Sequence, residues 1–430
     1  MAELFGELPD HPTPAVTARG APRLREAERR QSELRAITLD ELIDRDHLAR
    51  LVWDMVGRFD LRPLLDAIAA REGTPGHPQT DPRILVSLWL YATLDGVGSG
   101  RELELLCKQH AAYRWLCGGV SLNHHTLSDF RTDHAAWLDA ELVRGISGLL
   151  AAGTIDLASV AQDGLRVRAS AGKSSFRRKP RLEDFVRIAR ERVAQLKAEV
   201  AADPAASRSR REAAQARAAA ERLQRVEAAL AAMPQAEVRR KASKGDPKQA
   251  RVSTTDVEAR VMKMPDGGFR PAFNVQYCAE TRLGLVVAVG VSNAGADQSE
   301  LAPMHARVVQ AYGQPVPHWL ADGGYVSQPG IETLDQSGSE AYLPAGELLK
   351  DCDSPAVQAW RARMDTEAGQ AVYRWRARTI EWVNAQVRNA GLYGVNVRGL
   401  HKTGAVALWH ALAHNVSRLI RLGIPWPAPA

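Results

Sequence analysis

A long helical segment divides the strand-like sequence of this chain into two parts, and this division constrains the fold more than any other feature. Residues 155–163 (IDLASVAQD) form a short, β-compatible run. The next such runs, 269–279 (FRPAFNVQYCA) and 283–292 (LGLVVAVGVS), are joined by the short connection ETR, which is typical of a hairpin. The stretch in between, about residues 165 to 250, has helical spacing. We therefore expect one sheet that is interrupted by a helical insertion.

The insertion itself predicts two long helices with a common apolar seam. Its apolar residues keep alternating spacings of four and three, first at Leu182, Val186, Ala189, Val193, Leu196 and Val200, and then, after a break at Asp203-Pro204, at Ala219, Leu223, Val226 and Leu230. This spacing predicts a helical hairpin that packs on itself or against a partner subunit.

Basic residues gather at both ends of the insertion. Those before its first helix are Arg166, Arg168, Lys173, Arg177, Arg178, Lys179 and Arg181, and those after its second helix are Arg239, Arg240, Lys241, Lys244, Lys248 and Arg251. The whole chain holds 56 Lys and Arg against 50 Asp and Glu, which gives a net charge of +6. A balance of this size permits a polyanionic partner without requiring one.

The region before the first strand is helical from about residue 39 to residue 150. Residues 1–38 mix Pro, Arg and Glu without a period, and we expect a loosely ordered arm there. Helix starts are predicted at Asp81-Pro82, at Ser99 with Glu102 in capping-box spacing, and at Thr126, with the last helix running through Trp137. Residues 39–152 are therefore predicted to form a helical domain, either a helix-turn-helix-like module or a plain helical bundle.

Strands and helices alternate after the hairpin. The sequence predicts a helix from Glu300 to Tyr312, strands at 316–322 (VPHWLAD) and near 341–344, and long helices at Gly369–Asn389 and Ala405–Leu422. Residues 153–430 are thus expected to form an α/β domain with a mixed sheet, which the insertion at 165–250 interrupts.

Three acidic residues stand out as a candidate metal site. Two predicted strands end on an acid that precedes glycine, Asp163-Gly164 and Asp322-Gly323, and strand ends are where open α/β sheets bind ligands. The third acid, Glu381, lies on an Arg-rich helix. Such a set can hold two divalent cations, and ligands that are all oxygen suit Mg²⁺ or Mn²⁺. Taken singly, an Asp-Gly pair is usually a turn, and a Glu among arginines is usually part of a solvated helix face.

Several other polar residues are interpreted as structural or as weaker candidates. His410 and His414 share a helix face, but no third ligand is near, so we expect a packing role. The remaining residues of this kind are His124 and His125 at a helix start, Asp156 and Asp297 as alternative acids, and Cys107 and Cys117 as core residues.

The cysteines and the apolar segments exclude some classes of protein. None of the four cysteines forms a C-x-x-C pair, which argues against a disulfide scaffold and a zinc ribbon. The first residues, MAELFGELPDHP, have no apolar core of a signal peptide, and the run Ile84–Leu94 is shorter than a membrane span. We expect a soluble protein of the cytoplasm that makes no membrane contact.

The chain resembles the DDE transposases of bacterial insertion sequences over about residues 39–425. The shared runs include TDPRILVSLWLYATLDGVGSGRELE, HHTLSDFR, QDGLRVRA around Asp163, TTDVEARVMK, FNVQY and HWLADGGYVS around Asp322. The family's C-terminal signature is Tyr, Arg, Glu and Lys at fixed spacing, and it falls here on Tyr373, Arg376, Glu381 and Arg388. Arg388 stands where the family has Lys, and the Pro and Gly that usually follow the Glu are absent.

The resemblance implies a fold, an activity and partners. It implies a ribonuclease-H-like catalytic domain whose acids Asp163, Asp322 and Glu381 bind two Mg²⁺ or Mn²⁺ ions. These ions would serve in cutting transposon ends and in transferring the 3′-hydroxyl to target DNA. Expected partners are double-stranded DNA, as terminal inverted repeats and target, and a second copy of the chain, since two ends must be held together. Residues expected to contact DNA are Tyr373, Arg376, Arg388, Arg166, Arg168, Lys173, Arg177, Arg178 and Lys179. The alternative is a catalytically impaired, transposase-derived DNA-binding protein or repressor.

Overall fold

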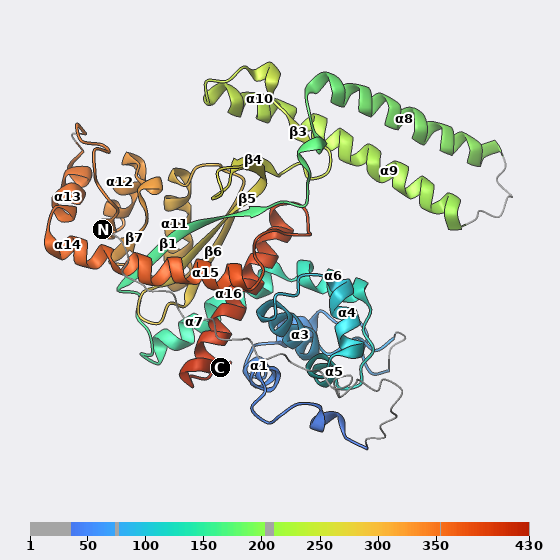
Figure 1. Cartoon of the computed structure of the whole chain (residues 1–430), viewed down its shortest axis with the longest axis horizontal. Coiled ribbons are helices and arrows are strands. Elements are labelled where there is room, and N and C mark those ends of the chain that lie inside the picture. Colours follow the sequence, from blue (N-terminus) through green and yellow to red (C-terminus); the bar gives the residue numbers. More distant parts are fainter. Residues whose placement is uncertain (1–35, 74–76, 203–209, 353, 430) are drawn as a thin grey trace, which may run out of the picture. The chain divides into compact units, whose positions relative to one another are not determined.

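The computed structural model describes residues 36–73, 77–202, 210–352 and 354–429 (Figure 1). The described residues from Leu39 onward form one compact unit. Most of the predicted N-terminal arm lies outside the described residues, as does the predicted break at Asp203-Pro204.

A six-stranded mixed sheet forms the centre of this unit, as the sequence predicts. Its strands are β1 (Ser159–Arg168), β4 (Arg260–Lys263), β5 (Phe269–Glu280), β6 (Val286–Ser292), β7 (His318–Leu320) and β8 (Glu340–Tyr342). The order is β4-β5-β1-β7-β8, and β6 also pairs with β5. The strands β4, β5, β6 and β1 pair antiparallel, whereas β7 and β8 continue the sheet in parallel with β1.

The sheet is covered on both faces. Every residue of β5 from Pro271 to Glu280 is buried, although successive side chains of a strand point to opposite faces. On one face, Tyr277 donates its hydroxyl proton to the carbonyl of Ala407 in α16 (Leu400–Leu422) at 3.0 Å. Asn415 of α16 also accepts from Val286 N–H and donates to Val286 C=O, both at 2.8 Å. One amide side chain thereby satisfies both backbone groups of a residue in β6.

Helices fill the region before the sheet. They are α1 (Leu48–Val56), α2 (Arg62–Asp66), α3 (Pro82–Leu94), α4 (Gly100–Gln109), α5 (Ala111–Cys117), α6 (His124–Asp133) and α7 (Ala135–Ala151). The helices α3, α6 and α7 all pack against α16, so they share one hydrophobic core with the sheet. The predicted caps are confirmed, because Asp81 accepts from Arg83 N–H at 2.8 Å and Ser99 from Glu102 N–H at 3.4 Å.

The helix predicted to open at Thr126 differs from the one observed. Asn123 accepts the backbone N–H of Thr126 at 2.9 Å, so the cap lies three residues earlier and α6 begins at His124. The helix then ends at Asp133, and α7 begins at Ala135. One predicted helix through Trp137 is therefore two.

The insertion contains two long helices side by side, α8 (Lys179–Ala202) and α9 (Arg210–Ala231), followed by α10 (Met233–Ala242) (Figure 1). The short strands β2 (Phe176–Arg177) and β3 (Val252–Ser253) pair at its base. Near this base, Leu182, Val186 and Val226 of the apolar seam are buried in a small separate core with Ala229, Met233, Ala250 and Val252.

The part of the chain after β6 contains more helices than predicted. They are α11 (Leu301–Tyr312), α12 (Gln328–Gln336), α13 (Pro355–Met364), α14 (Glu367–Tyr373), α15 (Trp382–Asn389) and α16. The single helix predicted over Gly369–Asn389 is interrupted, because a π-helical turn at Ala377–Glu381 separates α14 from α15. Within the described ranges, none of the helices combines the length and the hydrophobicity that a membrane-spanning helix needs.

The residues after α16 return to pack on α7. Trp426 is fully buried, and its Nε1–H donates to Glu141 at 2.8 Å. Its ring lies against Gly145, where an added Cβ would come within 2.0 Å of the indole. Gly145 therefore makes room for the tryptophan.

We predict that Gly145→Ala lowers the free energy of unfolding by roughly 1–3 kcal/mol, because the new methyl group overpacks the Trp426 site. The matched control is Gly404→Ala in α16, where a Cβ would meet no atom within 4 Å. That control should be neutral or stabilising by up to about 1 kcal/mol, since alanine favours helix. Urea denaturation measures both, and equal stabilities of the two variants would contradict the packing argument.

Two buried histidines of α16 confirm the packing role predicted for them. His414 donates its Nε2–H to the carbonyl of Gly284 at 2.9 Å, and burial lowers its pKa to about 4. Burial also lowers the pKa of His410 to about 3. Both are therefore neutral in the folded protein at pH 7.

These histidines predict a loss of stability in mild acid. Below pH 6.5 the unfolded chain protonates them while the folded chain does not, so the unfolded state binds more protons and stability falls as pH drops. At pH 5 the penalty is about 2 kcal/mol for each histidine. Thermal denaturation of His414→Gln should show a shallower fall between pH 7 and pH 5. The exposed control His401→Gln should keep the wild-type slope, and an unchanged slope in His414→Gln would contradict the assignment.

Candidate active site

Asp163 lies within β1 and does not end it. The strand continues to Arg168, and Asp163 and Gly164 pair with Tyr277 and Gln276 of β5. The prediction that the strand ends at Asp163 was wrong, and the interruption of the sheet begins after residue 168. Gly164 does not have a positive φ, so it does not form a sharp turn.

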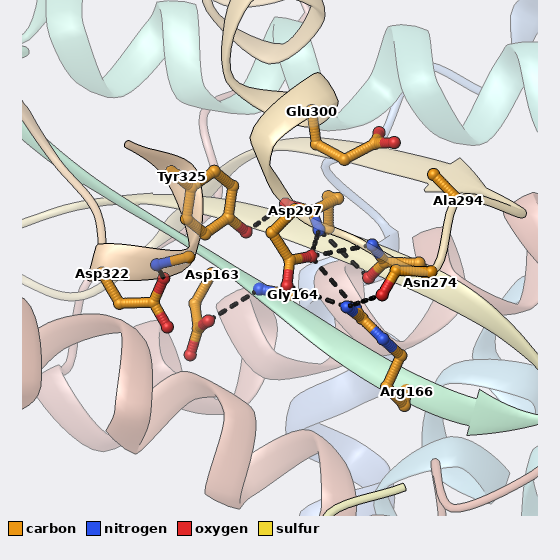
Figure 2. A network of polar contacts seen from close by, with 12 residues as sticks. Asp163, Gly164, Arg166, Asn274, Ala294, Asp297, Glu300, Asp322 and Tyr325 are labelled. Atoms are coloured by element: carbon orange, nitrogen blue, oxygen red, sulfur yellow. Dashed lines mark hydrogen bonds and ion pairs between the residues drawn. The ribbon is translucent and has the colours of Figure 1, made fainter. Parts of the chain in front are cut away.

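Gly164 is required instead by the side chains that crowd its face of the strand. A Cβ there would lie 2.5 Å from Gln276 Nε2, 2.6 Å from Asp297 Oδ1 and 2.9 Å from Asn274 Oδ1. Asp163, the preceding residue, points to the opposite face. One strand thus carries an acidic side chain on one face and a close-packed polar network on the other (Figure 2).

Strand register places Asp322 beside Asp163. β7 is the parallel neighbour of β1, and Leu320 pairs with Ala161. Asp163 and Asp322 therefore each lie two residues beyond this pair. β7 ends as predicted before Asp322, which caps the turn after it by accepting from Gly324 N–H at 2.8 Å.

The two aspartates repel each other. Burial and then the negative charge of Asp322 raise the pKa of Asp163 to about 6. The hydrogen bond from Gly164 N–H and the positive charge of Arg376 lower it, but by less. The Asp163 side chain is only 21% exposed. Carboxylates in this arrangement lack a full countercharge, which is the electrostatic condition for binding a cation.

Glu381 joins this pair through an arginine. Arg376 donates to Glu381 Oε1 at 3.1 Å, and its other terminal nitrogen lies 4.0 Å from Asp163 Oδ2. Its Nε–H donates to the hydroxyl of Tyr373 at 3.3 Å. The structure therefore brings Tyr373, Arg376 and Glu381 to Asp163. Within the described part of the chain, however, no three carboxylate, His or Cys residues lie close enough to hold one metal ion together.

Asn384 is a site residue that the sequence analysis missed. Its Nδ2–H donates to Asp163 Oδ2 at 3.0 Å, and its Oδ1 is buried without a partner. Asn384 lies three residues after Glu381, and residues with this spacing share a helix face. That spacing was the signal that could have identified it.

The network on the opposite face centres on Asp297, at the start of the segment that leads into α11 (Figure 2). Arg166 donates to both carboxylate oxygens of Asp297, at 2.8 and 3.0 Å, and to the carbonyl of Gly295 at 3.1 Å. Asn274 and Gln276 donate to Asp297 at 2.8 and 2.9 Å. Because protein donors already saturate Asp297, the structure makes it a structural acid. Arg166, predicted to contact DNA, is committed to the same ion pair.

The other basic residues predicted to contact DNA fall into separate groups. Arg168 and Arg388 line one surface cavity of about 380 Å³, together with Arg166, Arg270 and the half-exposed Tyr393. Lys173 lines a different cavity. Arg177 lies in β2, and the exposed Arg178 and Lys179 lie where α8 begins.

Comparison with known proteins identifies the family. A family model described as "Transposase domain (DUF772)" matches residues 37–133, and one described as "Transposase DDE domain" matches residues 349–420. The second match contains Tyr373, Arg376, Glu381 and Arg388. The two matches together support a DDE transposase of an insertion sequence. No match was found among curated proteins or among solved structures.

Membership of this family gives the transposase a general role. Transposases bind DNA and move segments of it, and the DDE members generally use a divalent metal ion. The DDE match covers Glu381 and the helices around it but stops short of Asp163 and Asp322. Asp163 is associated with that segment by the contacts of Arg376 and Asn384, and Asp322 lies beside Asp163 through the pairing of β1 with β7.

We predict that Gly164→Ala destabilises the transposase by roughly 1–3 kcal/mol, because its methyl group would displace Gln276 and Asp297. Gly172→Ala is the matched control, since its Cβ would come no closer than 3.4 Å to another atom. Chemical denaturation compares them. A Gly164→Ala protein as stable as the control would show that the polar network tolerates a side chain at this position.

Proposed function

We propose that this transposase cleaves DNA at the ends of its insertion sequence and joins the freed 3′-hydroxyl to target DNA, with Asp163, Asp322 and Glu381 as its acidic residues. The observation that carries the proposal is the matched position of Asp163 and Asp322, each two residues beyond the Ala161–Leu320 pair of the parallel strands β1 and β7. Burial and then the negative charge of Asp322 raise the pKa of Asp163, and a bound cation would offset both effects.

The topology supports a ribonuclease-H-like catalytic domain. Read from β6 through β5, β1 and β7 to β8, the sheet has three antiparallel strands followed by two that run parallel to the central strand. This is the mixed sheet that the family resemblance implies, with the first acid on the central strand and the second after its parallel neighbour.

The donor set fits Mg²⁺ or Mn²⁺ at the two aspartates. Both supply carboxylate oxygens, the ligands that these ions prefer, and no sulfur or imidazole donor takes part. Divalent ions bound there would stabilise negative charge on the attacking and leaving oxygens of the phosphodiester. For Glu381 to serve as a further ligand, its carboxylate must first be released from Arg376.

Arg376 is the residue that we expect to couple DNA binding to this release. Its guanidinium is 13% exposed, and one terminal nitrogen is buried without a hydrogen-bond partner. A DNA phosphate offers two oxygens that the planar guanidinium can bind with two parallel hydrogen bonds. Exchange of Glu381 for a phosphate would free the carboxylate, while Asn384 continues to orient Asp163.

The remaining assignments are part of the same proposal. The helices of residues 39–152 would recognise the terminal inverted repeats, and the cavity lined by Arg168 and Arg388 would hold the DNA backbone near Asp163. Two copies of the chain would bind two ends. We also propose the domain boundaries expected from the sequence, with 153–430 as the catalytic domain.

A DNA-binding protein without catalysis is the second candidate. The observation that favours it is the ion pair between Glu381 and Arg376, which occupies the third acid with a cation of the protein itself. The absence of the family's usual Pro, Gly and Lys after Glu381 points the same way.

The test of the first candidate is Asp163→Asn, assayed by Mg²⁺-dependent nicking of a plasmid that carries the ends of the insertion sequence. We expect the rate to fall by on the order of 10³-fold, since several kcal/mol of charge stabilisation is lost. Asp156→Asn, which changes an exposed acid just before β1, should nick like the wild type. Equal nicking by wild type and Asp163→Asn would refute the proposed site. Binding of the ends without nicking by the wild type would instead support the repressor.

A further inference from the structure

A second basic cavity lies at the base of the insertion, outside the acidic site. It has a volume of about 790 Å³ and is lined by residues of α10, of the β2–β3 pair and of the β4–β5 hairpin. Its cations are Lys173, Arg239, Arg240, Arg251 and Arg260. No Asp or Glu lines it.

Direct ion pairs do not neutralise these cations in the part of the chain that the structure describes. Among the described residues, none of the five forms an ion pair with a carboxylate. Arg240 donates only to the backbone carbonyl of Asp246, at 3.2 Å. Arg260 donates to the carbonyls of Val257 and Ala259, and its Nε is buried without any partner.

Arg260 shows that the arrangement is unfavourable for the empty protein. Burial, and then the positive charge of Arg239, lower the pKa of its guanidinium to about 10, although the charges of Glu258 and Asp256 act in the opposite direction. Burying a charge beside a like charge costs free energy unless a counter-ion compensates it. A cavity built in this way stabilises a bound anion.

Stabilisation of a helix end is a simpler explanation for these basic residues, but it accounts for only some of the five. Arg239 and Arg240 lie in the last turn of α10, where cations interact favourably with the helix dipole. Lys173, Arg251 and Arg260 come from other elements and gain nothing from that dipole. Convergence of three separate segments on one cavity therefore needs another cause.

The cavity is connected to the strand that carries Asp163. Gly295 lines it, and the carbonyl of Gly295 accepts from Arg166 at 3.1 Å. Arg166 lies three residues beyond Asp163 on β1, about 10 Å along the strand at ~3.3 Å per residue. The cavity rim also carries two exposed apolar side chains, Phe269 at 54% and Val261 at 46%. Such side chains can pack on the deoxyribose between successive phosphates.

We propose that this cavity binds the phosphodiester backbone of duplex DNA, as a site separate from the acidic residues. Arg239, Arg240 and Arg251 contact phosphates, and the buried Arg260 supplies a fixed positive charge beneath them. The binding of duplex DNA in this cavity is independent of the proposed function. Only the statement that this DNA is the duplex cut at Asp163 rests on the proposed function. The base of the insertion thus becomes the part that holds DNA, and the long hairpin α8–α9 extends from it.

The test measures the salt dependence of binding. Arg239→Gln and Arg251→Gln, both at exposed positions, are compared with wild type by fluorescence anisotropy on a labelled duplex of random sequence, in EDTA so that no cleavage occurs. Each variant should lower the slope of log affinity against log salt by about 1 and weaken binding roughly fivefold at ~0.15 M salt, because one phosphate contact is lost. Circular dichroism confirms that the variants are folded.

Arg222→Gln is the matched control. It removes the same charge from an exposed position of α9, in the same insertion but outside the cavity, and should leave slope and affinity unchanged. Unaltered binding by Arg239→Gln and Arg251→Gln would overturn the proposal, as would an equal loss in Arg222→Gln, which would indicate a general charge effect. Failure here with intact Mg²⁺-dependent nicking rejects the cavity alone. Loss of binding in a protein that never nicks rejects the catalytic proposal alone.

Discussion

The pairing of β1 with β5 on one edge and β7 on the other is the interaction on which the rest of the structure depends. It fixes Asp163 beside Asp322 by register, and it fixes Gly164 against Gln276 on the opposite face. Because side chains alternate along a strand, a shift by one residue would exchange the acidic face with the polar network. The ion pair of Arg166 with Asp297 and the close approach at Gly164 both disfavour that shift.

Charge compensation around Asp163 is incomplete, and the site's chemistry follows from this. Arg376 and Asn384 each contact the carboxylate, yet burial and Asp322 still raise its pKa to about 6. Arg376 forms ion pairs with both Asp163 and Glu381. It therefore holds the third acid at the site, but it also occupies the carboxylate of that acid. Both catalytic and repressor functions remain consistent with this one side chain, because they differ only in whether a phosphate can displace Glu381.

Local sequence predicted much of the fold but little of what depends on distant contacts. The β5–β6 hairpin, the helix ending at Tyr312, the strand before Asp322 and the caps at Asp81 and Ser99 were all predictable, since each depends on neighbouring residues. The reason for Gly164 was not, because an Asp-Gly pair signals a turn unless the partner strand is known. The bidentate pairing of Arg166 with Asp297 joins residues more than a hundred positions apart, so no local pattern revealed it. The contact of Asn384 with Asp163 is as distant in sequence, and only the spacing of Asn384 from Glu381 pointed to it.

The long helix α16 contacts α3, α6 and α7 on one part of its surface and the sheet on another, within a single hydrophobic core. The helices before the sheet are therefore not joined to it by a flexible tether. DNA bound by them would have a fixed orientation relative to Asp163, and its spacing from the cut would be set by the protein's own dimensions. For the same reason a fragment that starts at residue 153 would leave the apolar face of α16 uncovered, with aggregation as the expected outcome.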